Sequence, residues 1–340
     1  MSINLNALRR QVWNVFFVGG MATAFVLLLR EGLHQGWPLF FQLTVNGLTL
    51  GSVYALIAIG YSMVYGILKL LNFAHGDVYM VGAFIGYGIM TVFGAPPGSS
   101  IPLWLLIALM FGGAMIGCAL LGVVIERFAY RPLREAPRIA PLISALGVSF
   151  FLQNSALLLL GAQFRAYPFG LIATGGGVQL SSVFISATRI FVIAAAVLLM
   201  VLLTLFVNRT RLGKAMRATS YDREAAMMMG IDADRVIAAT FFIGSALAGA
   251  AGVMFGLVFT EIFHFMGFTA GLKGFTAAVV GGIGSIPGAM LGGLLIGLGE
   301  AFATGYVSST YQDLIVFSIL IFTIIVRPTG LLGTPAIQKV

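Results

Sequence analysis

Apolar segments separated by short polar connections follow one another along most of the chain. They lie at 12–29, 38–68, 78–93, 103–125, 139–160, 190–207, 236–259 and 314–326. A helix needs about 20 predominantly apolar residues to cross the hydrocarbon core of a bilayer. Because 38–68 is unusually long and carries no charge, we expect it to cross once and to continue as a tilted or broken piece. The pattern predicts eight full membrane-crossing helices.

The apolar segment at 275–299 differs from the others because it is rich in glycine and contains Pro287. Glycines at four-residue spacing, at Gly284, Gly288 and Gly292, allow another backbone to approach closely. Proline removes a helix donor, and the carbonyl that it frees must be satisfied by protein or water. We therefore expect a re-entrant pair of half-helices here rather than one plain crossing.

The basic residues indicate how the chain is oriented in the membrane. Four lie in 127–138 and six in 209–235, which together hold ten of the 19 lysines and arginines. Short loops rich in lysine and arginine face the cytoplasm. If the amino terminus is cytoplasmic, the predicted crossings place both basic connections in the cytoplasm. If 275–299 is re-entrant, Arg327 and Lys339 also lie on the cytoplasmic side. We expect both termini to be cytoplasmic.

Composition excludes a water-soluble protein. Hydrophobic residues make up 59% of the 340 residues and charged residues only 9%, whereas a soluble domain carries about 25% charged residues. The prediction is an all-α polytopic membrane protein, a single transmembrane domain over 1–340 in contact with lipid. The net charge of +8 could suggest nucleic acid, but neither basic connection interleaves aromatic residues with the charges. We expect no nucleic-acid partner.

The sequence carries no recognisable catalytic motif. Residues 210–215 are the nearest approach to a Walker A sequence, and they lack its first glycine and the hydroxyl after the lysine. No serine lies in a Gly-x-Ser-x-Gly elbow, and no metal-ligand spacing occurs. We expect a chain that is not an enzyme and binds no cofactor or metal.

The second basic connection, at 208–235, has the features of a short capped helix. Thr219 or Ser220 can cap it, and acidic residues in the first turn suit the positive end of the helix dipole. Gly230 can end it in a left-handed conformation. Small residues and methionines between these ends suit docking into another protein, and a solvated connector is the alternative. The docking residues are Asp222, Glu224, Ala225, Ala226, Met228 and Gly230.

Several motifs together resemble one family. Glu-Ala-Ala followed by glycine at 224–230 is similar to the core of the coupling loop of ABC importer permeases, although the Ile-x-Leu-Pro that often follows is absent at 237–240. The more specific motifs closely resemble LivH-type permeases of branched-chain amino acid ABC transporters. They are 46–66, 71–77, 131–134, 142–147 with 151–154, and 275–290. The resemblance begins near residue 42, and 12–29 looks like an additional amino-terminal helix.

This resemblance implies an ABC importer permease fold in the bacterial inner membrane. It also implies a homologous partner permease, two ATP-binding cassette subunits that carry ATP and Mg²⁺, and a periplasmic solute-binding protein. In the family, the helix around 222–230 sits in a cleft of the ATP-binding subunit and switches the pathway by alternating access. Two alternatives remain: a permease of the same build for urea, amides or another small polar solute, and an ion-coupled carrier or channel.

Polar groups within the apolar segments are candidates for the pathway. Asn72, His75 and Asp77 lie at or near a membrane boundary, where ionisable groups line a pathway or pair with each other. The alternative is a turn in which His75 and Asp77 bond locally and touch no solute. Exposed backbone in the broken segment can also meet a charged solute, and close helix packing is the alternative there. Its candidates are Gly281, Gly282, Gly284 and Pro287.

The remaining charges in the carboxyl-terminal half are expected near the membrane surface. Glu261, His264 and Lys273 are expected in an outer connection, where they either receive the binding protein or are merely solvated. Glu300 and Asp313 are expected to be interfacial, and lining the pathway is the alternative.

Overall fold

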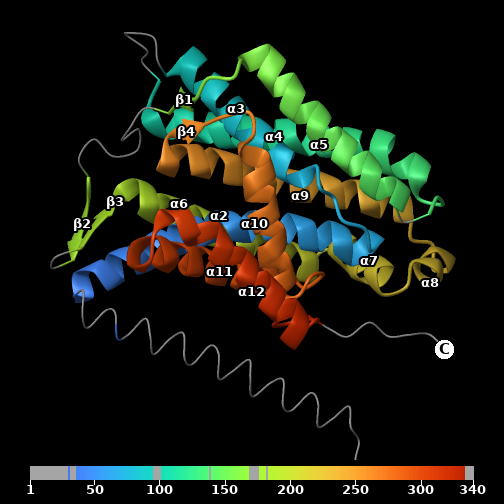
Figure 1. The fold of residues 1–340 in the computed structure, drawn as a ribbon. Helices are drawn as coiled ribbons and strands as arrows, with labels where there is room; N and C mark the ends of the chain where they lie inside the picture. Colours follow the sequence, from blue (N-terminus) through green and yellow to red (C-terminus); the bar gives the residue numbers. More distant parts are fainter. Residues whose placement is uncertain are drawn as a thin grey trace, which may run out of the picture.

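The computed structural model describes residue 30 and residues 36–94, 101–137, 139–167, 176–180 and 183–333. The predicted helix at 12–29 lies outside these residues. The long helices are α2 (Trp37–Leu68), α3 (His75–Phe93), α4 (Leu103–Ile125), α5 (Ile139–Leu160), α6 (Ala187–Arg209), α9 (Ala233–Phe259), α10 (Met266–Gly281), α11 (Ile286–Tyr306) and α12 (Gln312–Val326) (Figure 1).

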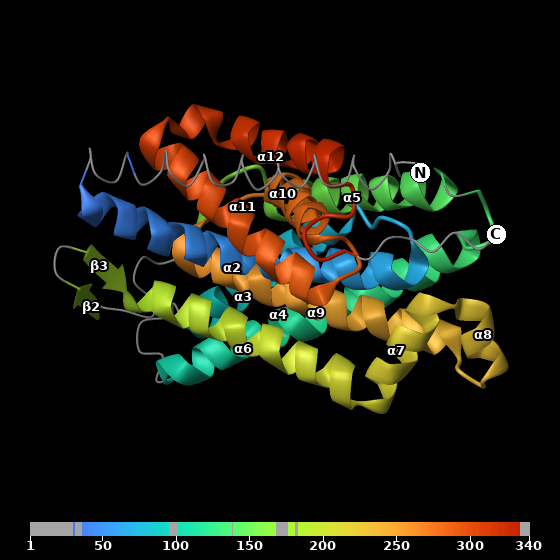
Figure 2. The same ribbon diagram turned by 90° about the horizontal axis from the view of Figure 1, so that it is seen from below.

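Shorter elements occupy the two ends of the bundle. Helices α7 (Arg211–Tyr221) and α8 (Arg223–Met228) lie at one end, and a two-stranded pair, β2 (Gly177–Leu180) with β3 (Val183–Ser186), lies at the other (Figure 2). A second pair joins β1 (Arg165–Ala166) to β4 (Glu261–Ile262). Short η1 (Glu126–Tyr130) and η2 (Arg131–Leu133) follow α4, and η3 (Ser309–Tyr311) precedes α12.

Eight helices within the described residues are long and apolar enough to cross a membrane. Seven of them coincide, within a few residues, with the apolar segments that follow 12–29, and the eighth is α11. The prediction of an all-α polytopic membrane protein is therefore confirmed. The two sets of eight differ in one member. The predicted set includes 12–29, which lies outside the described residues, and the observed set includes α11 instead.

The glycine-rich segment is broken at the expected place, but the pieces are not the two half-helices expected within 275–299. Gly282 and Gly284 have φ values of +109° and +92°, a left-handed region that glycine adopts at little cost, and they turn the chain between α10 and α11. Ser285 then caps α11, since its Oγ accepts from the Gly288 N–H at 3.2 Å. Pro287 falls in the first turn of α11, where a missing N–H costs nothing. It therefore begins a full-length helix rather than breaking one.

Helix α10 crosses the other helices steeply (Figure 1). Gly284, in the turn that follows α10, lines a small cavity together with Met216 and Arg217 of α7. The chain after α12 meets the α10–α11 turn, because the N–H groups of Leu331 and Leu332 donate to the carbonyls of Val280 and Gly281 at 2.9 and 2.8 Å. The end of α12 thus lies at the α7–α8 end of the bundle. That this end faces the cytoplasm stays a prediction.

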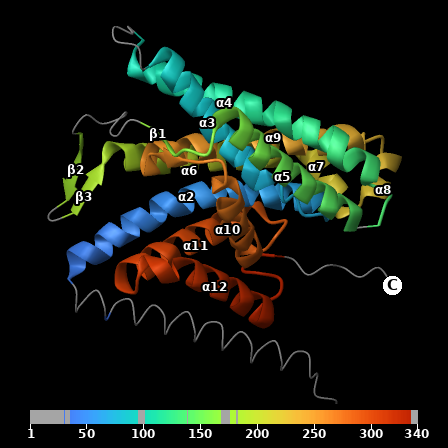
Figure 3. The ribbon, with the colours of Figure 1, turned by 45° about the horizontal axis from the view of Figure 1, so that its top comes forward.

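Contact between the backbones of α2 and α11 forms the centre of the fold. Helix α2 runs through the middle of the bundle, with α11 and α12 on one side and α3, α4, α5 and α9 on the other (Figure 3). A Cβ atom added to Gly297 would lie 2.2 Å from the Gly51 nitrogen, and one added to Gly293 would lie 2.4 Å from the Ala55 Cα. Only glycine permits this approach. Gly288 and Gly292 pack in the same way against α10, as their spacing predicts, whereas Gly284 lies in the turn, where a Cβ would meet only the Gly66 Cα at 3.7 Å.

We predict that Gly297→Ala destabilises the protein by ~1–3 kcal/mol, because the new methyl group forces α2 and α11 apart. Thermal unfolding in detergent measures the effect. Gly112→Ala in α4 is the matched control, since a Cβ there meets nothing within 4 Å and alanine favours a helix. Equal unfolding temperatures for the two variants would contradict the proposed contact.

Candidate functional site

The second basic connection contains the predicted capped helix, with a different cap. The carboxylate of Asp222 accepts from the Ala225 N–H at 3.1 Å and caps α8. The prediction of Thr219 or Ser220 as the cap is wrong. Both residues lie in the last turns of α7, where their hydroxyls donate to backbone carbonyls three or four residues earlier. Gly230 ends α8 with φ +82°, as predicted.

The surface of α8 is apolar and exposed. The side chains of Met228 and Met229 project fully from the bundle, with 82% and 83% of their surface exposed, and Tyr221 lies nearby with 82% exposed. Glu224 is also exposed and Ala225 is half-buried, but Ala226 is buried beneath the helix. Unpaired methionine and tyrosine side chains are characteristic of a surface that another protein covers. Ala226 positions the helix and is not part of this exposed face.

An ionic network joins the first basic connection to the start of α9. Arg134, after η2, forms ion pairs with Glu126, the first residue of η1, and with Asp234 in the first turn of α9. Arg131 also pairs with Asp234, at 2.5 Å. Asp234 follows α8 by only a few residues, so the network joins the two basic connections.

Sequence reasoning found the 131–134 motif but not its acidic partners. Glu126 is 108 positions before Asp234 in the sequence, and no local spacing relates the two carboxylates. The sequence feature that could have indicated this pairing is Glu126 itself. It directly follows an apolar run, and a buried acid needs a partner.

We predict that Arg134→Gln destabilises the protein by about 3–5 kcal/mol, because Glu126 stays buried without its partner (its side chain is 3% exposed). The change is read from the thermal unfolding of purified protein. Arg127→Gln serves as the control, since Arg127 is exposed in the same connection. Adding Glu126→Gln to Arg134→Gln restores part of the stability, and a double variant less stable than Arg134→Gln would disprove the pairing.

Asn72, His75 and Asp77 are buried between helices. The hydroxyl of Ser149 and the carboxamide of Gln153, both on α5, donate to the Asp77 carboxylate at 2.5 and 3.1 Å. The alternative in which the Asp77 side chain bonds within its own turn is therefore wrong. Asn72 accepts from the Tyr130 hydroxyl at 3.2 Å, and the His75 ring packs edge-on against Tyr61. His75 and Asp77 hold α3 to α2 and α5, and Asn72 holds the connection before α3 to η1. A contact of these residues with solute stays a prediction.

Gly281, Gly282, Gly284 and Pro287 surround the α10–α11 turn. A Cβ on Gly282 would collide with the backbone of Gly333, and one on Gly281 with that of Gly288. The carbonyl of Gly281 already accepts a backbone hydrogen bond. Gly284 lines a small cavity of about 80 Å³ beside α7. Close packing accounts for these contacts, and a role of the four residues in the pathway also stays a prediction.

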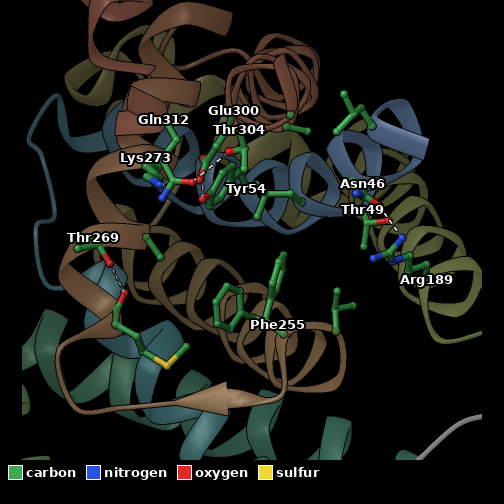
Figure 4. Close-up of a pocket in the computed structure, with 18 of the residues that line it drawn as sticks. Asn46, Thr49, Tyr54, Arg189, Phe255, Thr269, Lys273, Glu300, Thr304 and Gln312 are labelled. Atoms are coloured by element: carbon green, nitrogen blue, oxygen red, sulfur yellow. Dashed lines mark hydrogen bonds and ion pairs between the residues drawn. The ribbon is translucent and has the colours of Figure 1, made fainter. Parts of the chain in front are cut away.

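A larger cavity, of about 450 Å³, is drawn in Figure 4. It is lined by Arg189 in the first turn of α6 and by Phe259 at the end of α9, which are the helix ends away from α7 and α8. Helices α2, α6, α9, α10, α11 and α12 supply its walls. Its polar lining consists of Asn46, Thr49, Tyr54, Arg189, Thr269, Lys273, Glu300, Thr304 and Gln312. Its apolar lining includes Leu43, Leu50, Phe255, Val258, Phe259, Phe263 and Met266.

Two of the predicted surface charges, Lys273 and Glu300, line this cavity, and a third, Asp313, pairs with Lys273 without lining it. Lys273 belongs to α10 rather than to an outer connection, and its ammonium group lies 2.7 Å from a carboxylate oxygen of Glu300 and 2.7 Å from one of Asp313. The hydroxyl of Tyr54 donates to the other Glu300 oxygen at 3.0 Å. Lys273 and Glu300 are buried, so the interfacial placement of Glu300 is wrong, while Asp313 stays half exposed. Glu261, in contrast, is exposed in β4.

Comparison with known proteins places this architecture in a family. Residues 43–324 match the family model described as branched-chain amino acid transport system, permease component. The chain is 47% identical over 303 residues to BraD, a high-affinity branched-chain amino acid transport permease of Pseudomonas aeruginosa, covering 88% of this chain and 98% of BraD. It is 46% identical over 306 residues to LivH of Escherichia coli, with the same coverage.

More distant relatives and one solved structure also match. LivM of Escherichia coli, a permease protein of the high-affinity branched-chain amino acid transport system, is 27% identical over 88% of this chain and 72% of LivM. PsaBC from Streptococcus pneumoniae in complex with Fab has a TM-score of 0.46 and 13% identity, over 88% of this chain and 95% of that chain. The match to the family model and the close relatives, together with eight helices of membrane length, show that this multi-pass membrane chain belongs to the permease components of branched-chain amino acid transport systems.

Proposed function

We propose that this chain is the permease subunit of an ABC importer that carries branched-chain amino acids across the bacterial inner membrane. The observation that carries the proposal is the identity of 46–47% to BraD and LivH over nearly their whole length, since both are named as permeases of such systems. Separate ATP-binding subunits supply the energy, and a periplasmic binding protein delivers the solute.

Helix α8 supports the proposed transfer of energy. It presents exposed methionines beside Glu224, and Gly230 and Asp222 hold its two ends. In the proposal this face docks into a cleft of an ATP-binding subunit on the cytoplasmic side. The ionic network of Arg134 and Asp234 then carries its displacement into α4 and α9.

A homologous chain is the proposed partner permease. LivM, which is distantly related to this chain over most of its length, is named as a second permease of the same Escherichia coli system. A transporter with two related permeases can place its pathway between them. The α7–α8 end and both termini of this chain then face the cytoplasm.

Charge reversal or helix disruption at α8 tests the coupling. We predict that Glu224→Lys and Gly230→Pro each lower ATPase activity stimulated by the liganded binding protein at least tenfold, without lowering the amount of permease in the membrane. Proline cannot adopt the φ of +82° at position 230, and lysine reverses the charge of the docking face. The assay uses the complete transporter in proteoliposomes.

Glu135→Lys is the matched control, because it reverses an exposed charge in the first basic connection, outside α8. It is expected to keep at least half of the stimulated activity. Wild-type rates of ATP-driven uptake in both α8 variants would refute the docking role.

Solute competition tests the substrate. We predict that proteoliposomes with the whole transporter accumulate labelled leucine only when ATP is supplied to the ATP-binding subunits. Excess isoleucine or valine is expected to suppress the uptake, and excess urea or acetamide is expected to leave it unchanged. Suppression by urea would favour a permease for another polar solute, and accumulation without ATP would favour an ion-coupled carrier.

A further inference from the structure

One side of α6 is an exposed stripe of aliphatic side chains. The opposite side of the helix is buried against the bundle. The members of the stripe are between 47% and 58% exposed and are Val197, Leu198, Val201, Leu202 and Leu205. Spacings of three and four residues place them on the same side of the helix. Lipid tails are as apolar as leucine, so this stripe suits direct contact with acyl chains.

The aliphatic stripe ends in polar residues. Asn208 and Arg209 continue the spacing of three and four residues from Val201, Leu202 and Leu205, and both are exposed. Helix α6 has 23 residues, which corresponds to about 34 Å, and the hydrocarbon core of a bilayer is about 30 Å thick. A helix of this length that spans the core ends among the lipid headgroups. Arg209 is the last residue of α6.

Helix α7 adds more positive charge at the same place. Figure 2 shows α7 directly at the end of α6. Its exposed basic side chains are those of Arg211, Lys214 and Arg217. The Nη1 of Arg217 donates to the amide oxygen of Asn208 at 2.8 Å. Because Asn208 lies on the exposed side of α6, this bond holds the guanidinium of Arg217 beside the end of the aliphatic stripe.

These four cations lack acidic partners. Residues 208–221 contain no aspartate or glutamate. Among the residues that the structure describes, none forms an ion pair with Arg209, Arg211, Lys214 or Arg217. The first basic connection is different, because Arg131 and Arg134 both pair with Asp234. The charge beside α6 is therefore available to an anion from outside the chain.

The chemistry of the cluster favours a phosphate group. A guanidinium has five N–H donors, and it binds phosphate oxygens through two parallel hydrogen bonds. Arg217 uses a donor on Asn208 and keeps others. Basic residues next to a membrane helix attract anionic lipids, and each one near the surface contributes to the attraction. The position beside an aliphatic stripe selects a phosphate that carries acyl chains.

We propose that Arg209 and Arg217 form a binding site for the phosphodiester of an anionic phospholipid. Its acyl chains lie along the aliphatic stripe of α6, and Arg211 and Lys214 add positive charge around the headgroup. The stripe favours lipid over an acidic protein surface, because the charges lie where the stripe ends. The site is separate from the exposed methionines of α8, so the inference does not depend on the docking of α8 or on the solute that is transported.

Equilibrium lipid binding tests the site. The purified full chain is immobilised in detergent, and retention of radiolabelled phosphatidylglycerol or of phosphatidylcholine with the same acyl chains gives two dissociation constants. Wild type is expected to bind the anionic phosphatidylglycerol about fivefold more tightly or better. Arg209→Gln and Arg217→Gln are each expected to weaken phosphatidylglycerol binding about fivefold, the contribution of one basic residue near a charged headgroup. Both are expected to leave phosphatidylcholine binding within twofold.

Arg235→Gln is the matched control. Arg235 is an arginine in the first turn of α9 whose side chain is 87% exposed, and it pairs with Asp232 at 2.9 Å. This variant is expected to keep both dissociation constants within twofold of wild type. An equal loss in Arg235→Gln and Arg217→Gln would overturn the assignment, since it would reflect only the net charge of the protein.

Arg217→Lys tests the site with the charge retained. It is expected to recover part of the phosphatidylglycerol affinity that Arg217→Gln loses, and its unfolding temperature without lipid is expected to match that of wild type. Phosphatidylglycerol binding that is unchanged in both Arg209→Gln and Arg217→Gln would overturn the proposal.

Other ligands give different results. If inorganic phosphate displaces phosphatidylglycerol more than sodium chloride of the same ionic strength does, the site takes free phosphate and the lipid assignment fails. The assignment also fails if wild type binds the two lipids equally while Arg209→Gln and Arg217→Gln lower copurification of the ATP-binding subunits. That result would assign the cluster to an acidic protein surface.

Discussion

Close contact between the α2 and α11 backbones determines where nearly every other feature of the protein lies. Apolar surface gives little driving force for association inside lipid, so helices associate through van der Waals contact at small residues. Gly51 against Gly297 and Ala55 against Gly293 provide that contact. With the two helices fixed in this register, Tyr54 on α2 and Glu300 on α11 come within hydrogen-bonding distance of each other.

Charged groups supply a second layer of organisation. Within the bundle a charge must be paired, and the partners here come from distant parts of the chain. Lys273 on α10 joins Glu300 on α11 to Asp313 on α12. At the other end, Arg134 joins the start of η1, directly after α4, to the start of α9. The two networks lie toward opposite ends of the bundle, one beside the cavity and one beside α8.

This separation gives the molecule two specialised ends joined by continuous helices. Helix α9 carries Asp234 of the ionic network in its first turn and ends at Phe259 in the wall of the cavity. A single continuous helix therefore connects the two ends of the bundle.

Local sequence determined the helical architecture because apolar runs and helix ends depend on neighbouring residues. Run length predicted the membrane helices, Gly230 predicted the left-handed end of α8, and the spacing of Gly288 and Gly292 predicted close packing. The same local reasoning failed where several residues compete for one role. Asp222, rather than Thr219 or Ser220, caps α8, because α7 extends through both of those residues.

Tertiary structure alone decided which polar groups meet. Asp77 bonds to Ser149 and Gln153, 72 and 76 residues away, and Arg189 lies 143 residues from Asn46. Sequence separation carries no information about such pairs, since helix packing sets the distance between them. The position of Pro287 shows the same limit. Pro287 begins a helix here instead of breaking one, because the chain has already turned at Gly282 and Gly284. That turn accompanies the packing of α10 against α11.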